Sequence, residues 1–222
     1  MGSAIDVTIC IDGTKSFGET NWLSIFKERL LNIHNDLAKV YSTRGYPPIE
    51  SFRVRLIVFR DYMADADFAM MVTDFMELPR QQVDFERALS SICFDGGGDI
   101  SEDGLEALVY AIQSDWTQKG NIRRHVIMLF SDADAHDIGY NSGAEFYPRG
   151  MPANMRELTK FWEHPKCGQL YEKRLFLFAP DVGNWKSISD HWSFVWHVPV
   201  AEDYGSAGQI YDHLLEYVNS DI

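Results

Sequence analysis

The sequence predicts an α/β protein built on a doubly wound, mainly parallel sheet of six strands, with one antiparallel strand at the sheet edge and helices on both faces. Two observations lead to this prediction. Strand patterns alternate with amphipathic helix patterns along the chain. In addition, two apolar runs end abruptly in polar loops, as strands do at the carboxyl edge of an open α/β sheet. Such alternation implies right-handed crossovers between parallel strands.

Six stretches have the composition of strands. The first and the fourth are runs of apolar and β-branched residues, which is typical of strands that are buried on both faces. The second and third are joined by the polar stretch 61–67, which is too short for a parallel crossover, so we expect these two strands to pair antiparallel. The six predicted strands are 5–11, 52–59, 68–75, 125–130, 175–179 and 194–198.

Helix patterns fill most of the intervals between these strands. From Phe26 to Val40, apolar residues recur at steps of four and three, which is the stripe of an amphipathic helix. Ser101 is predicted to cap a later helix whose first turn carries the acidic residues Glu102 and Asp103, where negative charge complements the helix dipole. The predicted helices are 26–40, 82–91, 102–116, 155–162, 185–190 and 210–218.

The composition limits the class of protein. The 222 residues, 45% of them hydrophobic, are enough for one substantial core, so we expect a single domain over 1–222. A net charge of −13 argues against a nucleic-acid partner, and no apolar run is long enough to suggest a membrane span. Three cysteines are few and odd in number, which favours free thiols in a reduced compartment and hence a cytoplasmic location.

Two of the predicted strands end in carboxylates that have hydroxyl groups beside them. Asp12, Thr14 and Ser16 follow the first strand at every second residue, and Asp132 follows the fourth. Because the carboxyl ends of parallel strands meet at one edge of the sheet, where open α/β sheets bind ligands, we expect these side chains to converge. Carboxylate and hydroxyl oxygens suit a hard divalent cation, Mg²⁺ first, with Mn²⁺ or Ca²⁺ as alternatives.

These motifs resemble those of the von Willebrand factor type A (vWA) domain, and the resemblance covers essentially the whole chain. The family's first metal motif, Asp-x-Ser/Thr-x-Ser, is matched by Asp-Gly-Thr-Lys-Ser at 12–16. Its last metal motif, an apolar strand followed by Ser/Thr-Asp, is matched at 126–132. The resemblance implies a doubly wound sheet with a metal-ion-dependent adhesion site (MIDAS) at its carboxyl edge.

The middle metal motif departs from the usual family pattern. Many members have a threonine in a glycine-rich loop, whereas here three glycines, 96–98, are followed by Asp99. This Gly-Gly-Gly-Asp loop resembles the variant of some intracellular prokaryotic members. It implies Asp99 as a fifth metal ligand, with the hydroxyl of Ser101 as the alternative. A third carboxylate on the ion would lower the need for an acidic residue from a partner.

The resemblance implies a non-catalytic, metal-ion-dependent protein-binding module, used as an intracellular scaffold or adaptor. We expect a protein partner to contact the metal-site face and the aperiodic loop 133–153, which carries Tyr140, Phe146 and Tyr147. Loops of this length without secondary structure are often functional.

Two other interpretations remain open. The chain also resembles the Mg²⁺-dependent haloacid-dehalogenase phosphatases, a family of phosphotransfer enzymes, because Asp-Gly-Thr follows an apolar strand. Those enzymes use an aspartate two residues earlier as the nucleophile, and that position is Cys10 here, so the covalent step would lack its carboxylate. In the second interpretation the acidic residues only structure their loops.

Overall fold

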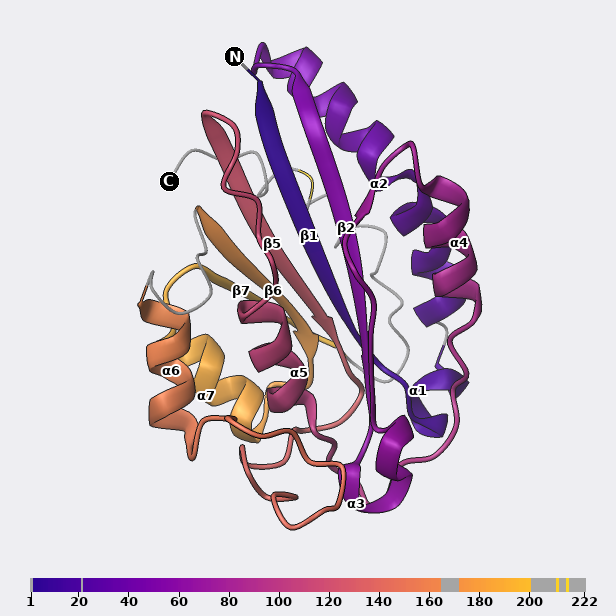
Figure 1. Ribbon diagram of the computed structural model, residues 1–222, viewed down its shortest axis with the longest axis vertical. Coiled ribbons are helices and arrows are strands. Elements are labelled where there is room, and N and C mark those ends of the chain that lie inside the picture. The colour runs from indigo at the N-terminus through magenta and orange to yellow at the C-terminus, as the bar shows by residue number, and fades with distance from the viewer. Residues whose placement is uncertain (1, 21, 165–171, 201–210, 212–214, 216–222) are drawn as a thin grey trace.

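The computed structural model describes residues 2–20, 22–164, 172–200, 211 and 215, and it has one central sheet with helices on both faces (Figure 1). This arrangement confirms the predicted α/β class. The predicted helix 210–218 lies outside the described residues, except for Tyr211 and Leu215.

The described residues form a mixed sheet of seven strands. These are β1 (Ser3–Asp12), β2 (Ile49–Phe59), β3 (Met70–Val72), β4 (Met76–Glu77), β5 (Ile122–Phe130), β6 (Lys173–Ala179) and β7 (Val195–Pro199). Their order is β3-β2-β1-β5-β6-β7, and β4 also pairs with β2. From β1 the chain moves outward first to β2 and later, on the other side, to β5, so the sheet is doubly wound. Strands β2, β1, β5, β6 and β7 are parallel.

The antiparallel edge is confirmed, but it consists of two short strands rather than the single predicted strand 68–75. Both β3 and β4 pair antiparallel with β2. Between them, the Thr73 hydroxyl accepts a hydrogen bond from the Leu56 N–H at 3.0 Å, and Arg55 Nε donates to the Thr73 carbonyl at 2.7 Å. The Thr73 N–H still donates to the Leu56 carbonyl at 3.0 Å, but side-chain bonds take part here, and the edge divides into two strands, which makes seven in the sheet.

Helices cover both faces of the sheet. They are α1 (Lys15–Glu19), α2 (Trp22–Arg44), α3 (Tyr62–Asp65), α4 (Gln82–Ser90), α5 (Gly104–Ile112), α6 (Met155–Glu163) and α7 (Gly183–His191), with a 3-10 turn at Ala66–Phe68. In Figure 1, α2 and α4 lie on one side of the sheet, and α5, α6 and α7 on the other. None of the helices in the described segments is both long and apolar enough to cross a membrane.

Alternation along β1 divides the interior into two cores. Its odd-numbered residues, such as Ile9, pack with Phe26 of α2 and Phe85 of α4. On the opposite face, Cys10 packs with residues of α5, α6 and α7, among them Trp185. Successive side chains of a strand point to opposite faces, so a strand covered on both faces is mostly apolar.

The helix predicted over 102–116, with Ser101 as its cap, begins two residues later. Helix α5 starts at Gly104, and its N-cap residue is Asp103, which makes no side-chain capping bond. The residues before it run alongside another segment instead: the Glu102 N–H donates to the Asp134 carbonyl at 3.3 Å, and the His136 N–H donates to the Glu102 carbonyl at 2.9 Å. Pairing with a distant segment thus holds Glu102 outside the helix.

The carboxyl ends of the central parallel strands lie together at the lower end of the molecule in Figure 1, near α1, α3 and the loop that follows β5. The register places Ile11 of β1 beside Phe130 of β5, so Asp12 and Ser131 emerge side by side. Asp12 also pairs with Phe59, the last residue of β2. Three strands therefore deliver their loops to one place.

A buried ion pair ties the first two strands together farther up the sheet. The Asp6 carboxylate, which is fully buried, accepts hydrogen bonds from Arg53 Nε at 2.8 Å and Nη2 at 2.6 Å. It also accepts from the Thr117 N–H at 2.6 Å. Removing one partner of a buried pair leaves an uncompensated charge in the interior.

We expect Arg53→Met to lower the free energy of unfolding by about 3 kcal/mol, because Asp6 would stay buried without its counter-charge. Urea unfolding monitored by circular dichroism measures the loss. Arg87→Met is the control, since Arg87 and Asp84 form an exposed pair on α4, and this change should cost less than about 1 kcal/mol. Equal losses in the two variants would contradict this account of the Asp6 pair.

Candidate metal centre

The Asp12 carboxylate organises the hydroxyl groups around it. Oδ1 accepts hydrogen bonds from the Thr14 N–H at 3.0 Å and the Thr14 hydroxyl at 2.6 Å, and Oδ2 accepts from the Ser131 hydroxyl at 2.8 Å. Burial raises the pKa of Asp12 to about 6, against the opposing effect of the Thr14 and Ser131 hydrogen bonds. Because these hydroxyl hydrogens point at Asp12, oxygen lone pairs remain available to a cation.

The structure brings Asp12, Thr14, Ser16 and Asp132 together. The Thr14 and Ser16 hydroxyl oxygens lie 3.1 Å apart, and the Ser16 side chain lowers the pKa of Asp132 against the larger effect of burial, which raises it. The charge of Asp132 contributes to the raised pKa of Asp12. Together with Ser131 these residues form what we call the Asp12 group.

Glu102 is a carboxylate beside this group that sequence reasoning missed. Its side chain is only 3% exposed, and its Oε2 atom makes no hydrogen bond within the described structure. A Cβ atom added to Gly97 would lie 3.0 Å from Glu102 Oε1 and 3.3 Å from Thr14 Cγ2, so Glu102 and Thr14 both pack against this glycine. In the sequence, Glu102 is marked only by its position in an acidic run after the glycines, and the same pattern is typical of the first turn of a helix.

Burial and neighbouring negative charges change the pKa of Glu102. Burial, followed by the charges of Asp12, Asp61 and Asp65, raises its pKa to about 9. In the ion-free protein Glu102 is therefore largely protonated at neutral pH. A bound cation would remove the need for that proton.

Asp99 contacts a neighbouring set of side chains rather than those of the Asp12 group. Its side chain is 55% exposed, and its Oδ1 atom accepts from the Ser101 N–H and lies 3.2 Å from His136 Nε2. The same His136 nitrogen lies 3.3 Å from Asp61 Oδ2. These three residues, the His136 group, could hold a metal ion. Coordination by Asp99 of an ion bound at the Asp12 group stays a prediction.

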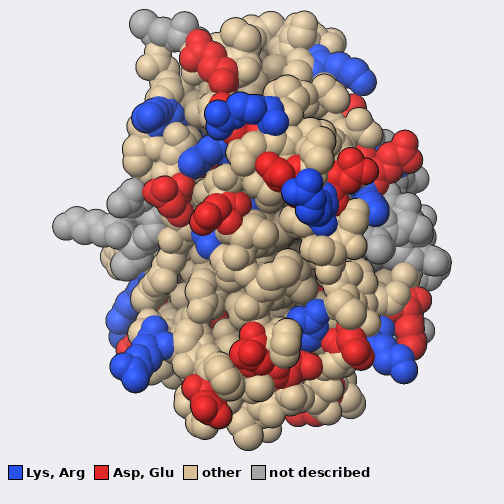
Figure 2. Space-filling view, turned by 45° about the vertical axis from the view of Figure 1, so that its right-hand side comes forward, with Lys and Arg blue, Asp and Glu red and all other residues tan. Residues whose placement is uncertain are grey.

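Arg60 fixes the loops that carry these residues. Its guanidinium donates to the backbone carbonyls of Gly13 at 3.0 Å, Phe68 at 2.7 Å and Asp95 at 2.9 Å, and also to that of Cys93. One side chain at the end of β2 thus joins three loops by main-chain acceptors. Figure 2 shows acidic side chains gathered at the lower end of the molecule, where these loops lie.

The long loop after β5 is anchored to buried acids of α5 and its N-cap. Glu106 Oε1 accepts from the Tyr147 hydroxyl at 2.5 Å and the Gly139 N–H at 3.0 Å, while the Asn141 amide donates to Asp103 at 2.9 Å. The predicted loop 133–153 is therefore held in a defined place beside the His136 group.

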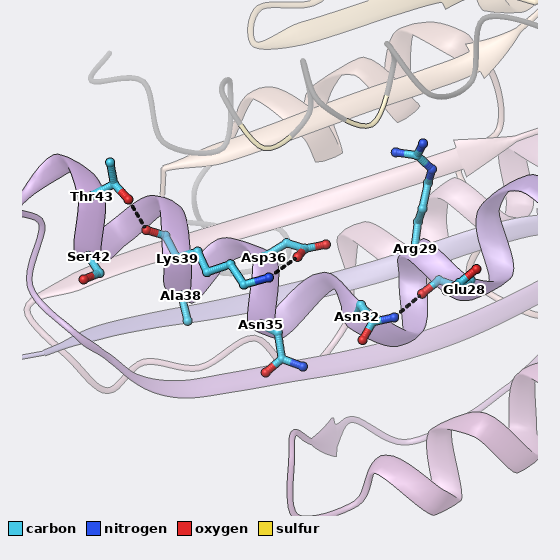
Figure 3. Close-up of a pocket in the computed structure, with 9 residues that line it drawn as sticks. All are labelled: Glu28, Arg29, Asn32, Asn35, Asp36, Ala38, Lys39, Ser42 and Thr43. Carbon is cyan, nitrogen blue, oxygen red and sulfur yellow. Dashed lines mark hydrogen bonds and ion pairs between the residues drawn. The ribbon is translucent and has the colours of Figure 1, made fainter.

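A hollow on the surface of α2 does not have the features of a functional site. It is lined by nine residues between Glu28 and Thr43 (Figure 3). The bonds drawn there, such as Asn32 Nδ2 to the Glu28 carbonyl at 2.9 Å and Lys39 to Asp36 at 3.4 Å, stay within one helix. They are the ordinary contacts of an exposed helix face.

The donor set of the Asp12 group fits a hard divalent cation. Carboxylates of Asp12 and Asp132 and hydroxyls of Thr14 and Ser16 supply oxygens only, the ligands that Mg²⁺ and Ca²⁺ prefer. Asp132 Oδ1, like Glu102 Oε2, is buried and makes no hydrogen bond within the described residues. Buried polar atoms are almost always paired, and a cation would satisfy both of these oxygens.

The architecture matches solved structures, among them the crystal structure of the pilus adhesin SpaC from Lactobacillus rhamnosus GG. The TM-score is 0.59 with 10% sequence identity, and the match covers 97% of this chain but only 30% of the adhesin chain. No family model and no curated protein matches the sequence. At this identity the likeness concerns the fold alone, and that fold is vWA-like.

We expect Glu102→Gln to stabilise the ion-free protein at pH 8. The pKa of Glu102 in the folded protein is about 9, above its ordinary value of 4.5. The folded state therefore binds this proton more tightly than the unfolded state does. The resulting stabilisation is complete below pH 4.5 and is lost as the pH rises toward 9. The wild-type free energy of unfolding should fall over this range by up to about 1 kcal/mol per pH unit, and the variant should show a much smaller fall.

Urea titrations in chelator at pH 5, 7 and 8 measure this difference. Glu86→Gln, at an exposed position on α4, should follow the wild-type curve. A Glu102 variant with the same pH dependence as the wild type would show that Glu102 is not the titrating group.

Proposed function

We propose that this chain is a non-catalytic, metal-ion-dependent protein-binding module, a single vWA domain over 1–222 with a MIDAS-type site, used as an intracellular scaffold or adaptor. The observation that carries the proposal is the convergence of Asp12, Thr14, Ser16 and Asp132 from two strand ends onto one small region. Mg²⁺ is the proposed ion, with Mn²⁺ or Ca²⁺ as alternatives. Asp99, the predicted fifth ligand, contacts His136, so the proposal rests on the other four residues.

The chain's own residues prepare this site in two ways. Asp12 orients the hydroxyls of Thr14 and Ser131 by accepting their hydrogens. Arg60 holds the surrounding loops by their carbonyls, so little ordering remains to be done when a partner binds. The bound ion would supply a positive charge that neutralises the carboxylates and a coordination position that a partner group or water completes.

Exposed apolar side chains beside the site support a protein as the partner. Ile100 is 86% exposed, Met63 66% and Tyr140 64%. They belong to α3, to the loop that follows the three glycines and to the loop 133–153, which are the segments that carry the His136 group. Apolar residues around a polar centre are typical of protein interfaces. The net charge of −13 disfavours nucleic acid or an anionic membrane as the partner.

A cytoplasmic location is part of the same proposal. Cys10 and Cys93 are free thiols, and Cys93 is exposed, which suits a reducing compartment. The adhesin that shares this fold is a much longer chain, and its role as a pilus adhesin does not transfer on a likeness of the fold.

The residue at the position of the phosphatase nucleophile does not support the alternative function of phosphotransfer. Cys10 stands where those enzymes have an attacking aspartate, and its side chain is completely buried against α5, with its thiol 3.9 Å from the Ala107 carbonyl. Burial also raises the pKa of the Cys10 thiol. A thiol that is protonated and inaccessible is a poor nucleophile.

We expect Mg²⁺ or Mn²⁺ to stabilise the native protein by about 2.7 kcal/mol at a hundredfold excess over the dissociation constant. Asp12→Ala combined with Asp132→Ala should erase this gain, because it removes carboxylates from both strand ends. Thermal unfolding with and without the ion measures the shift. The control pair, Asp84→Ala with Asp190→Ala, removes exposed acids from α4 and α7 and should keep the full shift; a parent protein without any shift refutes the proposed ion site.

We also expect a partner to be retained by the immobilised protein only when the ion is present. Capture from an extract of the source organism, repeated in chelator, tests this. The Asp12/Asp132 double variant should lose the same partner, and Ile100→Asp should weaken its retention at unchanged ion affinity. Equal retention with and without chelator would show that partner binding does not depend on the ion.

A further inference from the structure

We infer that the His136 group is a second cation site, separate from the Asp12 group, that binds a borderline transition ion of the Zn²⁺ class through Asp61, Asp99 and His136. An imidazole nitrogen with two carboxylates is a donor set that suits Zn²⁺ and its neighbours better than Mg²⁺. This inference goes beyond the proposed function and does not depend on it.

The Asp61 carboxylate is held in place by the start of a helix. As the N-cap of α3, its Oδ1 atom accepts from the Met63 N–H at 2.6 Å and the Ala64 N–H at 2.9 Å. Its Oδ2 atom lies 3.3 Å from His136 Nε2. The side chain is only 4% exposed, so capping fixes one oxygen and presents the other to the site.

The imidazole of His136 is fixed from two sides. Its backbone N–H donates to the Glu102 carbonyl, which ties this segment to the glycine-rich loop. Its ring stacks on Tyr140 with the centroids 4.3 Å apart and the planes 10° apart. His136 is 7% exposed. In protein metal sites, contacts outside the ligand set hold the histidine ligand in a fixed orientation.

The two distances from the imidazole nitrogen to the carboxylate oxygens match those of tetrahedral coordination. His136 Nε2 lies 3.3 Å from Asp61 Oδ2 and 3.2 Å from Asp99 Oδ1, and all three ligand atoms lie within 4.8 Å of one another. Ligands about 2.0 to 2.1 Å from a Zn²⁺ ion at tetrahedral angles are about 3.3 Å apart. Because Asp99 is half exposed, a fourth position is open to water or to a partner.

Local charge also favours an ion here over a simple contact between a protonated histidine and two acids. The charges of Asp61 and Asp65 both act on Glu102, and that of Asp61 acts on Asp103. One imidazolium would offset a single negative charge of this cluster, whereas a divalent ion offsets two.

Titration calorimetry of the full chain with Zn²⁺, in buffer saturated with Mg²⁺, tests the inference. We expect one Zn²⁺ per chain, and an absorption spectrum of tetrahedral type when Co²⁺ replaces it. Asp61→Asn keeps the helix cap, since asparagine caps as well as aspartate, and it should lower Zn²⁺ affinity at least about tenfold. His136→Gln should do the same, because even outer contacts of metal ligands are worth about tenfold or more.

The controls separate this site from the first. His191→Gln removes an exposed histidine of α7, and Asp12→Asn with Asp132→Asn disables the Asp12 group; both should keep Zn²⁺ affinity within about twofold. The inference is overturned if the parent takes up no Zn²⁺, or if His136→Gln binds it as well as the parent. Loss of Zn²⁺ binding in the Asp12/Asp132 variant would also overturn it, because there would then be a single site. Loss of the Mg²⁺ response with Zn²⁺ binding intact would instead refute only the proposed function.

Discussion

The concentration of buried carboxylates at the carboxyl edge of the sheet is the constraint on which the rest of the structure depends. Asp12 and Glu102 are both almost inaccessible, and the charge of Asp12 helps to raise the pKa of Glu102. Neighbouring negative charges that have left water cost free energy unless donors, protons or a cation compensate them. The hydroxyls of Thr14 and Ser131 provide donors to Asp12, and Glu102 keeps its proton in the absence of an ion. The arrangement is therefore one that a divalent cation relieves.

The fold maintains this arrangement by bonds between segments that are distant in sequence. Two apolar cores hold the sheet from both faces, and the register of β1 against β5 sets Asp12 beside Ser131. Arg60 then binds the carbonyls of three loops, and the backbone of Glu102 pairs with the segment after β5. These bonds use main-chain acceptors, and two carboxylate oxygens at this edge, Asp132 Oδ1 and Glu102 Oε2, make no hydrogen bond within the described residues.

The two groups at this edge differ in donor chemistry although they are neighbours. The Asp12 group offers oxygen atoms only, whereas the His136 group includes an imidazole nitrogen. Hard cations prefer the first kind of site and borderline transition ions the second. Glu102 connects them physically, since its side chain packs near Thr14 and its carbonyl accepts the His136 N–H. A partner that covers Ile100 and Tyr140 would contact both loops at once.

The sequence by itself determined the α/β class, the parallel core strands and the meeting of Asp12 with Asp132, because apolar periodicity and strand ends are local properties of the chain. It did not determine the two-strand edge at Thr73, the start of α5 at Gly104 or the place of Asp99. It also gave no role to Asp61 or Glu102 at the sheet edge. Those features depend on which backbone groups of distant loops pair, as Glu102 does with Asp134 and His136. Only the tertiary structure decides such pairings, since a loop's direction is set by its neighbours in space rather than by its own residues.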